Sequence, residues 1–367
     1  MIIITTQCFP PRIGGIEGLI YGLCMALSER GHEVTVFADG DNSHNETSFD
    51  RAQSFAIRRH AGLKPLRRRK KARNIGQWLR RHKADGIIAD SWKSLEHLPP
   101  GLSPLRLCLA HGMEIPEHTS RPKGRRIQAS LDKATAIIAN SRFTANRVRR
   151  YIQDPERLHI INPGIMPPQR PDLLQAERIK IRLNGRTPVL ITVARLERRK
   201  GHHKVLSLLP QFIKNYPALL YVIIGDGPEY TALQGLTTKL GLEQHVLFAG
   251  VVGEQERNAY LEQSDLFLMP GSMEKNDVEG FGIAYMEAAC FGVPAIAGHS
   301  GGAAEAVLDK ETGLICRAGD DTALAAGLAR LLADEDLRHR LGNNARERVH
   351  ALLWPNIIKD YERLLDI

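Results

Sequence analysis

The sequence predicts an α/β protein made of two Rossmann-like, doubly wound domains, and three observations support this prediction. Short apolar segments of strand type alternate with helical patterns through both halves of the 367-residue chain. Such alternation implies right-handed crossovers and parallel sheets. The alternation is interrupted at residues 162–171, which hold four prolines and one glycine, and then restarts. The length suits two domains at roughly 100–200 residues each.

The expected strands are short and mostly apolar. In the first half they lie at residues 2–4, 33–38, 86–91, 105–110, 136–141 and 158–164; in the second at 189–194, 219–224, 246–250, 265–270, 294–297 and 313–316. Leucines 19, 23 and 27 recur on one face of a predicted helix that ends at Gly31.

These elements divide the chain into an N-terminal domain at residues 1–165 and a C-terminal domain at 166–350. The tail at 351–367 contains Trp354, Tyr361 and Leu365 in an amphipathic pattern after a proline. We expect the tail to form a helix that crosses back to pack on the N-terminal domain.

Composition excludes several classes of protein. No segment approaches the ~20 apolar residues of a membrane span, and the N-terminus lacks the basic and apolar regions of a signal peptide. The five cysteines are scattered, with no CxxC pair, which favours a reducing cytoplasm over a disulfide framework or zinc site. No His/Cys/Asp cluster predicts any metal site.

The net charge of +9 belongs to the first half, because residues 1–165 carry +12 and residues 166–367 carry −3. Twelve of the basic residues lie in the basic run, defined here as residues 58–83. One interpretation is a solvated loop and helix face. Another is a patch for anionic lipid head groups, worth about 1 kcal/mol per basic residue near a membrane. Nucleic acid is not expected as a partner, because no nucleic-acid-binding motif accompanies the run.

Two features of the first half favour a ligand site. Gly14 and Gly15 lie where a strand-to-helix loop meets its helix, and small residues there let backbone amides approach a phosphate. Such a pair is also common in plain turns. His111 follows the strand at 105–110, at the sheet edge where open α/β folds bind ligands. A packed or capping histidine is the structural alternative.

The second half is organised around the segment from Asp277 to Ala289. A glycine-bearing turn leads from the strand at 265–270 into a helix, with Glu279 in the loop and Glu287 inside the helix. The free N–H groups and positive dipole end of such a helix suit a phosphorylated or hydroxyl-rich ligand. Acidic residues near helix starts also serve as simple dipole partners.

Two cations complete the candidate site. Arg195 and Lys200 follow the strand at 189–194, and together they suit a diphosphate, since arginine offers bidentate geometry and lysine a point charge. They would stabilise the charge that develops on a leaving diphosphate. The sequence shows neither a Walker A loop nor a nucleophile elbow.

With these residues in hand, the chain resembles the GT-B fold glycosyltransferases of family GT4 over nearly its whole length. The marks are Glu279 and Glu287 in an E-x7-E motif, Arg195-Leu196 with Lys200-Gly201, Gly225-Asp226-Gly227-Pro228-Glu229, and Gly14-Gly15. The segment from Asp277 to Glu305 is similar to mannosyltransferases of phosphatidylinositol mannoside and lipopolysaccharide synthesis that use GDP-mannose.

The resemblance implies a role for each matching residue. Gly14, Gly15, Arg195 and Lys200 would hold the diphosphate, and Glu287 the ribose hydroxyls. Glu279 would contact the donor sugar beside the backbone amides of Phe281, Gly282 and Ile283. His111 would lie by the transferred sugar, and Gly225, Gly250 and Val251 near the nucleotide. The implied catalytic set is His111, Arg195, Lys200 and Glu279.

The resemblance further implies a retaining, metal-independent hexosyl transfer without a cofactor, most simply of mannose from GDP-mannose to a glycolipid or lipopolysaccharide-type acceptor. A UDP-sugar donor, glucose or N-acetylglucosamine, is the alternative of the same class. An inactive GT-B subunit that binds a partner is the alternative of another class. The expected location is cytoplasmic, with peripheral attachment at the inner membrane face through the basic run.

Overall fold

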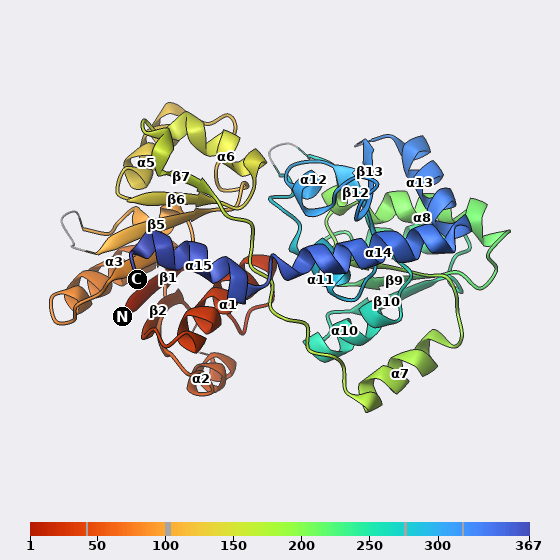
Figure 1. Cartoon of the computed structure of the whole chain (residues 1–367), viewed down its shortest axis with the longest axis horizontal. Coiled ribbons are helices and arrows are strands. Elements are labelled where there is room, and N and C mark those ends of the chain that lie inside the picture. The colour runs from red at the N-terminus through yellow and green to blue at the C-terminus, as the bar shows by residue number, and fades with distance from the viewer. Residues whose placement is uncertain (42, 100–103, 275–276, 318) are drawn as a thin grey trace. The chain divides into compact units, whose positions relative to one another are not determined.

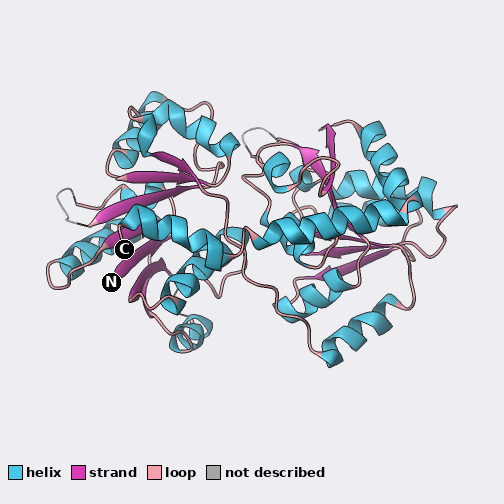
Figure 2. Cartoon of the chain, in the orientation of Figure 1, coloured by secondary structure: helices cyan, strands magenta, loops and turns pink. Residues whose placement is uncertain are grey.

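The chain folds into two compact units (Figures 1 and 2). The computed structural model describes residues 1–41, 43–99, 104–274, 277–317 and 319–367. The first unit comprises Met1–Met166 together with Leu352–Ile367, and the second comprises Pro167–Ala351. The change of unit thus falls within the proline-rich segment 162–171.

A seven-stranded parallel sheet forms the centre of the first unit, in the order β3-β2-β1-β4-β5-β6-β7. Its strands are β1 (Ile2–Thr6), β2 (Val34–Asp39), β3 (Ala56–His60), β4 (Gly86–Ala89), β5 (Leu105–Ala110), β6 (Ala136–Ala139) and β7 (Leu158–Ile160). β1, β2, β4 and β6 are buried along their whole length, which is why their sequences are mostly apolar and do not alternate with polar residues at every second position. The strand order reverses between β1 and β4, so the sheet edge there is a topological switch point.

The helices of the first unit surround this sheet (Figure 2). They are α1 (Gly15–Glu29), α2 (His44–Arg51), α3 (Lys64–Leu79), α4 (Trp92–Leu95), α5 (Arg121–Leu131), α6 (Arg142–Val148) and α15 (Trp354–Leu365), with short 3-10 turns at Arg149–Tyr151 and Pro155–Arg157. α3 contributes Ala72 and Ile75 to the same core cluster as Phe37 of β2 and Ile87 of β4.

The last helix, α15, returns to the first unit and packs on α1. Its apolar face buries Trp354, Ile358 and Tyr361, and burying a large apolar side chain stabilises a fold by roughly 1.5–3 kcal/mol. Glu362 fixes the orientation, because its carboxylate accepts from Arg30 and lies 2.9 Å from His32 Nε2. The predicted return of the C-terminal helix is confirmed.

The second unit repeats the architecture around six parallel strands, in the order β10-β9-β8-β11-β12-β13. The strands are β8 (Val189–Val193), β9 (Leu220–Ile224), β10 (Val246–Gly250), β11 (Leu266–Met269), β12 (Ala295–His299) and β13 (Gly313–Arg317). The helices are α7 (Leu173–Leu183), α8 (His202–Ile213), α9 (Tyr230–Lys239), α10 (Glu254–Glu262), α11 (Ile283–Cys290), α12 (Ala303–Ala306), α13 (Asp321–Ala333) and α14 (Glu335–His350), with a 3-10 turn at Arg198–Lys200. Its switch point lies between β8 and β11. The predicted pair of doubly wound sheets is confirmed.

The basic run is more structured than the sequence indicates. Residues 58–60 belong to the edge strand β3, which the sequence pattern does not predict, and α2 before it is also unforeseen. An edge strand is paired on one side only. Its side chains here are mostly exposed or half-buried, so the apolar alternation that reveals a buried strand is missing.

The helices leave no candidate for a membrane crossing: within the described ranges, none is both long and apolar enough to span a bilayer.

Candidate active site

An ion-pair cluster joins the segment after β8 to the segment between β11 and α11 in the second unit. We define it as Glu197, Arg199, Lys200, Asp277 and Glu279. Lys200 Nζ lies 2.5 Å from Glu279 Oε2, and Arg199 Nη1 lies 3.3 Å from the same oxygen. Arg199 also pairs with Asp277 at 3.1 Å and with Glu197 at 3.0 Å. A single arginine therefore joins three carboxylates. Glu197 lies between Arg195 and Lys200 in the sequence, and Asp277 and Glu279 lie in the segment from Asp277 to Ala289.

Local backbone geometry holds Lys200 in place. Gly201, the next residue, has φ +84°, a conformation that side-chain-bearing residues rarely adopt. A Cβ at Gly201 would lie 2.7 Å from the carbonyl oxygen of Pro270, which follows β11. Only glycine fits so closely, so the turn carrying Lys200 is pressed against the end of β11.

Another close approach positions Glu279. The N–H of Gly302 donates to the carbonyl of Glu279 at 2.8 Å, and a Cβ at Gly302 would lie 2.0 Å from the carbonyl oxygen of Gly280. The loop bearing Glu279 is thus clamped on the turn after β12. Both flanking turns are built on glycine, which lets the backbones meet without an intervening side chain.

The charge of Glu279 is set by its cations. Burial alone raises the pKa of this carboxyl, but the charges and hydrogen bonds of Lys200 and Arg199 outweigh burial, and the pKa lies below its usual value. Glu279 is therefore ionised at neutral pH. Lys200 is only 13% exposed, so its charge is partly desolvated and acts strongly on any anion that reaches it.

Arg195 does not touch Glu279. Its side chain is 71% exposed and pairs with Glu197 at 3.0 Å. Since Glu197 also pairs with Arg199, Arg195 and Lys200 are joined through a chain of ion pairs. Arg195 keeps most of its guanidinium in solvent, free to take part in binding an anion.

Helix α11 begins immediately beyond this cluster. Gly282 is its N-cap and Ile283 its first residue, while the Phe281 side chain is buried. First-turn N–H groups have no acceptor within a helix, so this end of α11 offers donors and a positive dipole to an anion or hydroxyl. Tyr285 fastens the helix to the sheet, because its hydroxyl donates to the carbonyl of Met269 at 2.7 Å.

Glu287 lies on α11 and has a separate cationic partner. Arg257 Nη1 of α10 lies 3.0 Å from Glu287 Oε1, and both side chains are about a quarter exposed. The two glutamates of the E-x7-E motif are thus neutralised by different cations. Neither Arg199 nor Arg257 is foreseen from the sequence.

The glycines expected near the nucleotide are neighbours. The N–H of Gly225, after β9, donates to the carbonyl of Gly250 at the end of β10, at 2.8 Å. Val251 follows with 58% of its surface exposed. An exposed valine beside bare backbone at a strand end provides a small apolar surface of the sort that a base packs on.

His202, also missed from the sequence, is buried directly after the cation-bearing turn. Burial, with smaller contributions from Lys200 and His203, lowers the pKa of His202 to about 3. Neither ring nitrogen has a hydrogen-bond partner among the described residues. His202 is therefore a neutral imidazole that adds no charge to the ion-pair cluster.

In the first unit, His111 follows β5, the strand next to β4 and the switch point of the sheet. His111 Nε2 is 2.9 Å from the carbonyl oxygen of Asp90 and must carry the proton, since a carbonyl only accepts. Asp90, which follows β4, accepts from Thr6 Oγ1 at 2.8 Å and from the Gln7 N–H at 2.6 Å. The ends of β1, β4 and β5 thus share one polar network.

Gly14 and Gly15 begin α1 in the same unit: Gly14 is the N-cap and Gly15 the first helical residue. The carboxylate of Glu17 folds back over this end, since a Cβ at Gly14 would lie 2.2 Å from Glu17 Oε2. A phosphate at this helix start would have to displace that carboxylate. The nearby Cys8 is no nucleophile, because burial, aided by Glu17 and Asp90, raises the pKa of its thiol to about 12.

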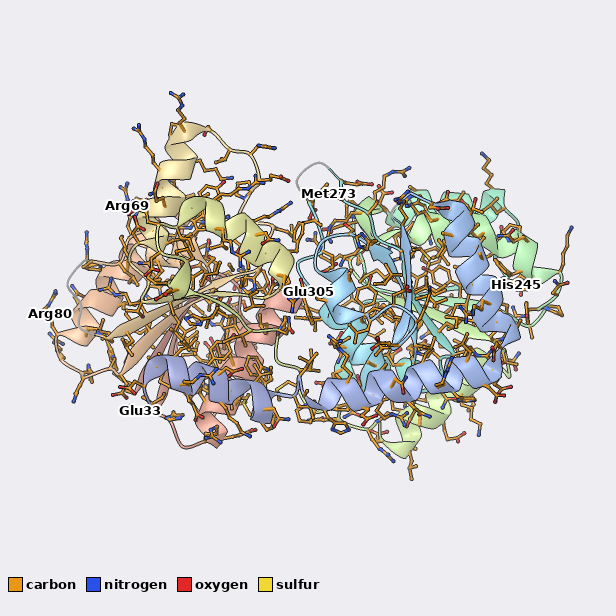
Figure 3. The ribbon with its side chains drawn as sticks, turned by 45° about the horizontal axis from the view of Figure 1, so that its top comes forward. Glu33, Arg69, Arg80, His245, Met273 and Glu305 are labelled. Carbon is orange, nitrogen blue, oxygen red and sulfur yellow. The ribbon has the colours of Figure 1, made fainter. Side chains whose placement is uncertain are left out.

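Several cations of the basic run form ion pairs with carboxylates of the first unit. Lys71 is buried and lies 2.7 Å from Asp39 Oδ1, while Arg67 pairs with Asp39 Oδ2 at 2.8 Å. Arg59 pairs with Asp50 at 2.7 Å. Arg69, in the second turn of α3, and Arg80, directly after its last residue (Figure 3), have no carboxylate partner among the described residues.

Among the residues that the structure describes, no group of three or more His, Cys, Asp or Glu side chains is arranged to hold a metal ion. The polar groups gathered in the second unit are instead alternating cations and carboxylates. Such an arrangement suits a negatively charged ligand, whose oxygens would replace the carboxylates on the same cations.

Comparison with known proteins matches both units to family models. Residues 13–167 match the model "Glycosyltransferase Family 4" and residues 175–348 match "Glycosyl transferases group 1". A Mycolicibacterium smegmatis protein, the GDP-mannose-dependent alpha-(1-6)-phosphatidylinositol monomannoside mannosyltransferase, is 31% identical over 91% of this chain and 89% of its own. Its Mycobacterium tuberculosis counterpart is 30% identical over 95% and 94%.

Solved structures share the fold at lower identity. Anabaena HepE, crystallised with UDP, aligns with a TM-score of 0.82 and 21% identity over 100% of this chain and 99% of its own. WaaG, a glycosyltransferase involved in lipopolysaccharide biosynthesis, aligns with a TM-score of 0.71 and 18% identity over 100% and 99%.

Proposed function

Because this chain belongs to glycosyltransferase family 4 and is a hexosyltransferase, we propose that it moves mannose from GDP-mannose to a hydroxyl of a glycolipid, with retention at the anomeric carbon. The observation that supports this donor most is the likeness, over nine-tenths of the chain, to GDP-mannose-dependent mannosyltransferases. Those relatives act on a phosphatidylinositol monomannoside, so we propose an acceptor of the same class.

The proposed donor site lies in the second unit. Lys200 and Arg195 bind the diphosphate, Glu287 accepts hydrogen bonds from the ribose hydroxyls, and Glu279 accepts from hydroxyls of the sugar. The N–H groups of Phe281, Gly282 and Ile283 contact the sugar, while Gly225, Gly250 and Val251 lie by the base. The observation behind these roles is that the ion-pair cluster places cations, carboxylates and the start of α11 together.

The proposed chemistry needs no enzyme nucleophile. The bond between the anomeric carbon and the diphosphate oxygen breaks, and the acceptor hydroxyl attacks the same face. Its proton passes to the departing diphosphate, so the product keeps the donor configuration. Lys200 and Arg195 would stabilise the charge that grows on the leaving oxygen, a type of stabilisation worth about 10²–10³ in rate for a single donor. Ionised Glu279 holds the sugar instead of acting as an acid.

In the first unit we propose His111 as the group beside the transferred sugar, with Gly14 and Gly15 against the diphosphate. Asp90 holds the His111 ring with Nε2 protonated and leaves Nδ1 as an acceptor. The polar network at the ends of β1 and β4 fixes that orientation.

We further propose peripheral attachment to an anionic membrane through the start of α3, without a membrane-spanning helix. Leu63 and Leu66 are 75% and 63% exposed, and Lys64 and Arg69 stand beside them. Exposed leucines flanked by cations suit an interface in which the apolar groups enter the head-group layer and the cations meet lipid phosphates.

Flotation with phosphatidylglycerol-containing vesicles at low and high salt tests this attachment. The double change Leu63→Ser and Leu66→Ser is expected to lower the bound fraction by about tenfold, since one buried leucine contributes roughly 1.5 kcal/mol or more. The matched control is Leu173→Ser with Leu174→Ser, which removes two exposed leucines from α7 in the other unit. Equal behaviour of the two variants would contradict the proposed surface.

The transfer itself is tested by incubating the full chain with GDP-mannose and phosphatidylinositol monomannoside. We expect a new α-configured mannosyl linkage, read by the anomeric proton in NMR. If a product formed only from UDP-glucose or UDP-N-acetylglucosamine, the proposed donor would be wrong, while the proposed type of reaction would stand. Absence of product from all three donors would favour a subunit that binds and does not transfer.

A further inference from the structure

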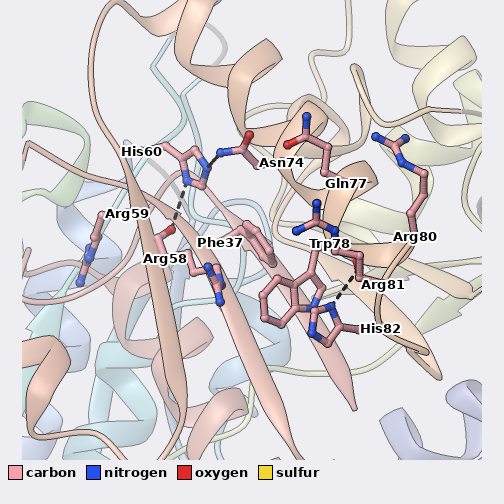
Figure 4. A pocket seen from close by; sticks show the side chains of 10 residues that line it. All are labelled: Phe37, Arg58, Arg59, His60, Asn74, Gln77, Trp78, Arg80, Arg81 and His82. Atoms are coloured by element: carbon pink, nitrogen blue, oxygen red, sulfur yellow. Dashed lines mark hydrogen bonds between the residues drawn. The ribbon is translucent and has the colours of Figure 1, made fainter.

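A pocket of about 580 Å³ lies at the outer edge of the first unit, between strand β3 and the end of α3 (Figure 4). The residues that line it are mostly basic or aromatic, and none is acidic: Phe37, Arg58, Arg59, His60, Asn74, Gln77, Trp78, Arg80, Arg81 and His82. Three of its four arginines, Arg58, Arg80 and Arg81, have no carboxylate partner among the described residues, so the cavity has a positive potential.

Strand register explains which lining cations face the cavity. Phe37 of β2 pairs with Arg58 of β3, so both side chains lie on the sheet face that α3 covers. Arg59, the next residue, points to the opposite face, where Asp50 of α2 holds it at 2.7 Å. Arg59 therefore belongs to the wall, and Arg58 is the arginine of β3 available to a ligand.

Aromatic stacking orients Arg58 without using its donors. The guanidinium carbon lies 3.9 Å from the centre of the Trp78 ring, and the His82 ring stacks on the same tryptophan at 3.8 Å. An arginine stacked on an aromatic ring keeps the N–H groups of its plane free. Within the described part of the chain, Arg58, Arg80 and Arg81 form no ion pair with a carboxylate.

The remaining walls are polar and fixed. His60 Nδ1 is 3.1 Å from the carbonyl of Arg58 and must donate to it, which leaves Nε2 to accept from Asn74 Nδ2 at 3.0 Å. The indole nitrogen of Trp78 is shielded from solvent and has no hydrogen-bond partner among the described residues. Since this nitrogen is closed to solvent, Trp78 contributes to the pocket through the stacking of its ring on Arg58 and not as a donor to a ligand.

We propose that this pocket binds a phosphate monoester. Arg58, Arg80 and Arg81 supply planar forks that suit phosphate oxygens. A doubly charged tetrahedral anion has more oxygens to offer several guanidinium groups than a single carboxylate has. A phosphate monoester occurs on the lipid phosphatidic acid and on soluble phosphate esters, and the pocket chemistry is shared by both.

One alternative accounts for part of the pocket but not the whole. Cations after a helix end interact favourably with its dipole, which would explain Arg80 and Arg81. That effect gives no role to Arg58, which comes from a strand and stacks on Trp78. The pocket is also separate from the start of α3, where Leu63 and Leu66 lie, and its ligand does not depend on the proposed transferase activity.

NMR of the wild-type chain tests the proposal directly. Glycerol 3-phosphate is expected to shift the indole N–H signal of Trp78 in a saturable way. The indole of Trp92 already donates to the carbonyl of Glu114 at 3.0 Å, so its signal serves as the internal control and should stay in place. No saturable shift at Trp78 with either glycerol 3-phosphate or phosphatidic acid vesicles would overturn the proposal.

Calorimetry with matched charge variants supplies the second test. Arg58→Gln with Arg81→Gln is expected to weaken glycerol 3-phosphate binding by about tenfold or more, since hydrogen bonds to charged groups are strong. Lys70→Gln with Arg73→Gln removes the same net charge from exposed positions on α3 outside the pocket and should change binding by less than about twofold. Equal weakening by the two pairs would reduce the effect to general electrostatics and contradict a pocket.

The source of the phosphate is read from the same variants. If the wild type binds phosphatidic acid vesicles more tightly than phosphatidylglycerol vesicles, and binding falls in the pocket variant alone, the occupant is a lipid head group. If only glycerol 3-phosphate responds, it is a soluble ester. Either result supports the pocket, and variants that unfold leave the Trp78 signal of the wild type as the deciding measurement.

Discussion

The ion-pair cluster of the second unit and the basic run of the first use cations in opposite ways. In the cluster, Lys200 and Arg199 converge on Glu279, so each positive charge has a negative neighbour. In the basic run, Lys71 and Arg67 are paired internally with Asp39, while Arg58, Arg80 and Arg81 meet no described carboxylate. Paired cations suit exchange of one anion for another, whereas unpaired ones suit steady attraction of an external anion.

This contrast makes the count of basic residues a poor guide to function. Lys71 is 2% exposed and holds β2 to α3, so it contributes to stability and not to a surface charge. Arg199 lies in a unit whose half of the chain is net acidic, yet it is central to the candidate active site. Burial and partners, not charge density along the sequence, separate the structural cations from the functional ones.

Lys71→Ala should produce the largest change in stability. The substitution removes a buried partner of Asp39 and of the Thr6 carbonyl, and breaking a buried ion pair costs about 3–5 kcal/mol. Urea unfolding measures the loss. The control Lys70→Ala, at the exposed neighbouring position, should stay within about 0.5 kcal/mol. If the two variants were equally stable, Lys71 would not be an internal cation.

Lys200→Ala should chiefly slow transfer. The diphosphate would lose a partly desolvated cation as its charge develops, and we expect kcat to fall about 10²–10³-fold. Steady-state assays of sugar transfer give the value, with Lys214→Ala, an exposed lysine after α8, as the control. A kcat close to wild type would remove Lys200 from the catalytic set.

Arg199→Gln sharpens the comparison through pH. The pKa of Glu279 lies below its usual value of 4.5. Its stabilising contribution is therefore complete above that value and is lost as pH falls through the lowered pKa. Loss of Arg199 raises the pKa of Glu279 and lowers the free energy of unfolding at pH 7 by about 2 kcal/mol. Because less of this stabilisation is then left to lose, the free energy of unfolding should fall less between pH 7 and pH 3 in the variant than in the wild type.

Thermal unfolding of Arg199→Gln at both pH values measures this effect. Arg198→Gln is the control, because Arg198 is 60% exposed and its single ion pair among the described residues, with Glu229, is long at 3.8 Å. Parallel pH curves for wild type and Arg199→Gln would show that Arg199 does not act on Glu279.

Glu287→Ala should have the smallest effect of this series, and on binding more than on kcat. A ribose contact through one carboxylate is worth about 1.5 kcal/mol, or roughly tenfold in affinity for the nucleotide. Calorimetry with GDP compares it with Glu262→Ala, an exposed glutamate at the end of α10. Unchanged affinity for GDP would show that Glu287 does not bind the ribose and that its ion pair with Arg257 is purely structural.

The sequence predicts the frame of this protein well because its central strands are buried on both faces. β1, β4 and β9 are continuous apolar runs that end where the polar loops begin. Runs of this kind suffice to place His111, Lys200 and Glu279 in loops that follow strand ends. Edge strand β3 escapes prediction, since exposed positions carry no apolar pattern.

The sequence does not predict which charged side chains pair with one another. Arg199 lies between two residues of a basic triplet, Arg198 and Lys200, and only the fold distinguishes the one that meets three carboxylates. Arg257 stands 30 residues before its partner Glu287, on a different helix. Asp39 and Lys71 are likewise distant in sequence, and their pairing depends on α3 lying over β2.

The most direct test of the proposed active site and its donor is calorimetry of the full chain with GDP-mannose, GDP, UDP-glucose, UDP-N-acetylglucosamine and UDP. We predict saturable binding of GDP-mannose and GDP, with a gain in stability of about 2.7 kcal/mol at a hundredfold excess over the dissociation constant. Binding of the uridine compounds alone would overturn the proposed donor, and absence of binding by every nucleotide would contradict the proposed active site.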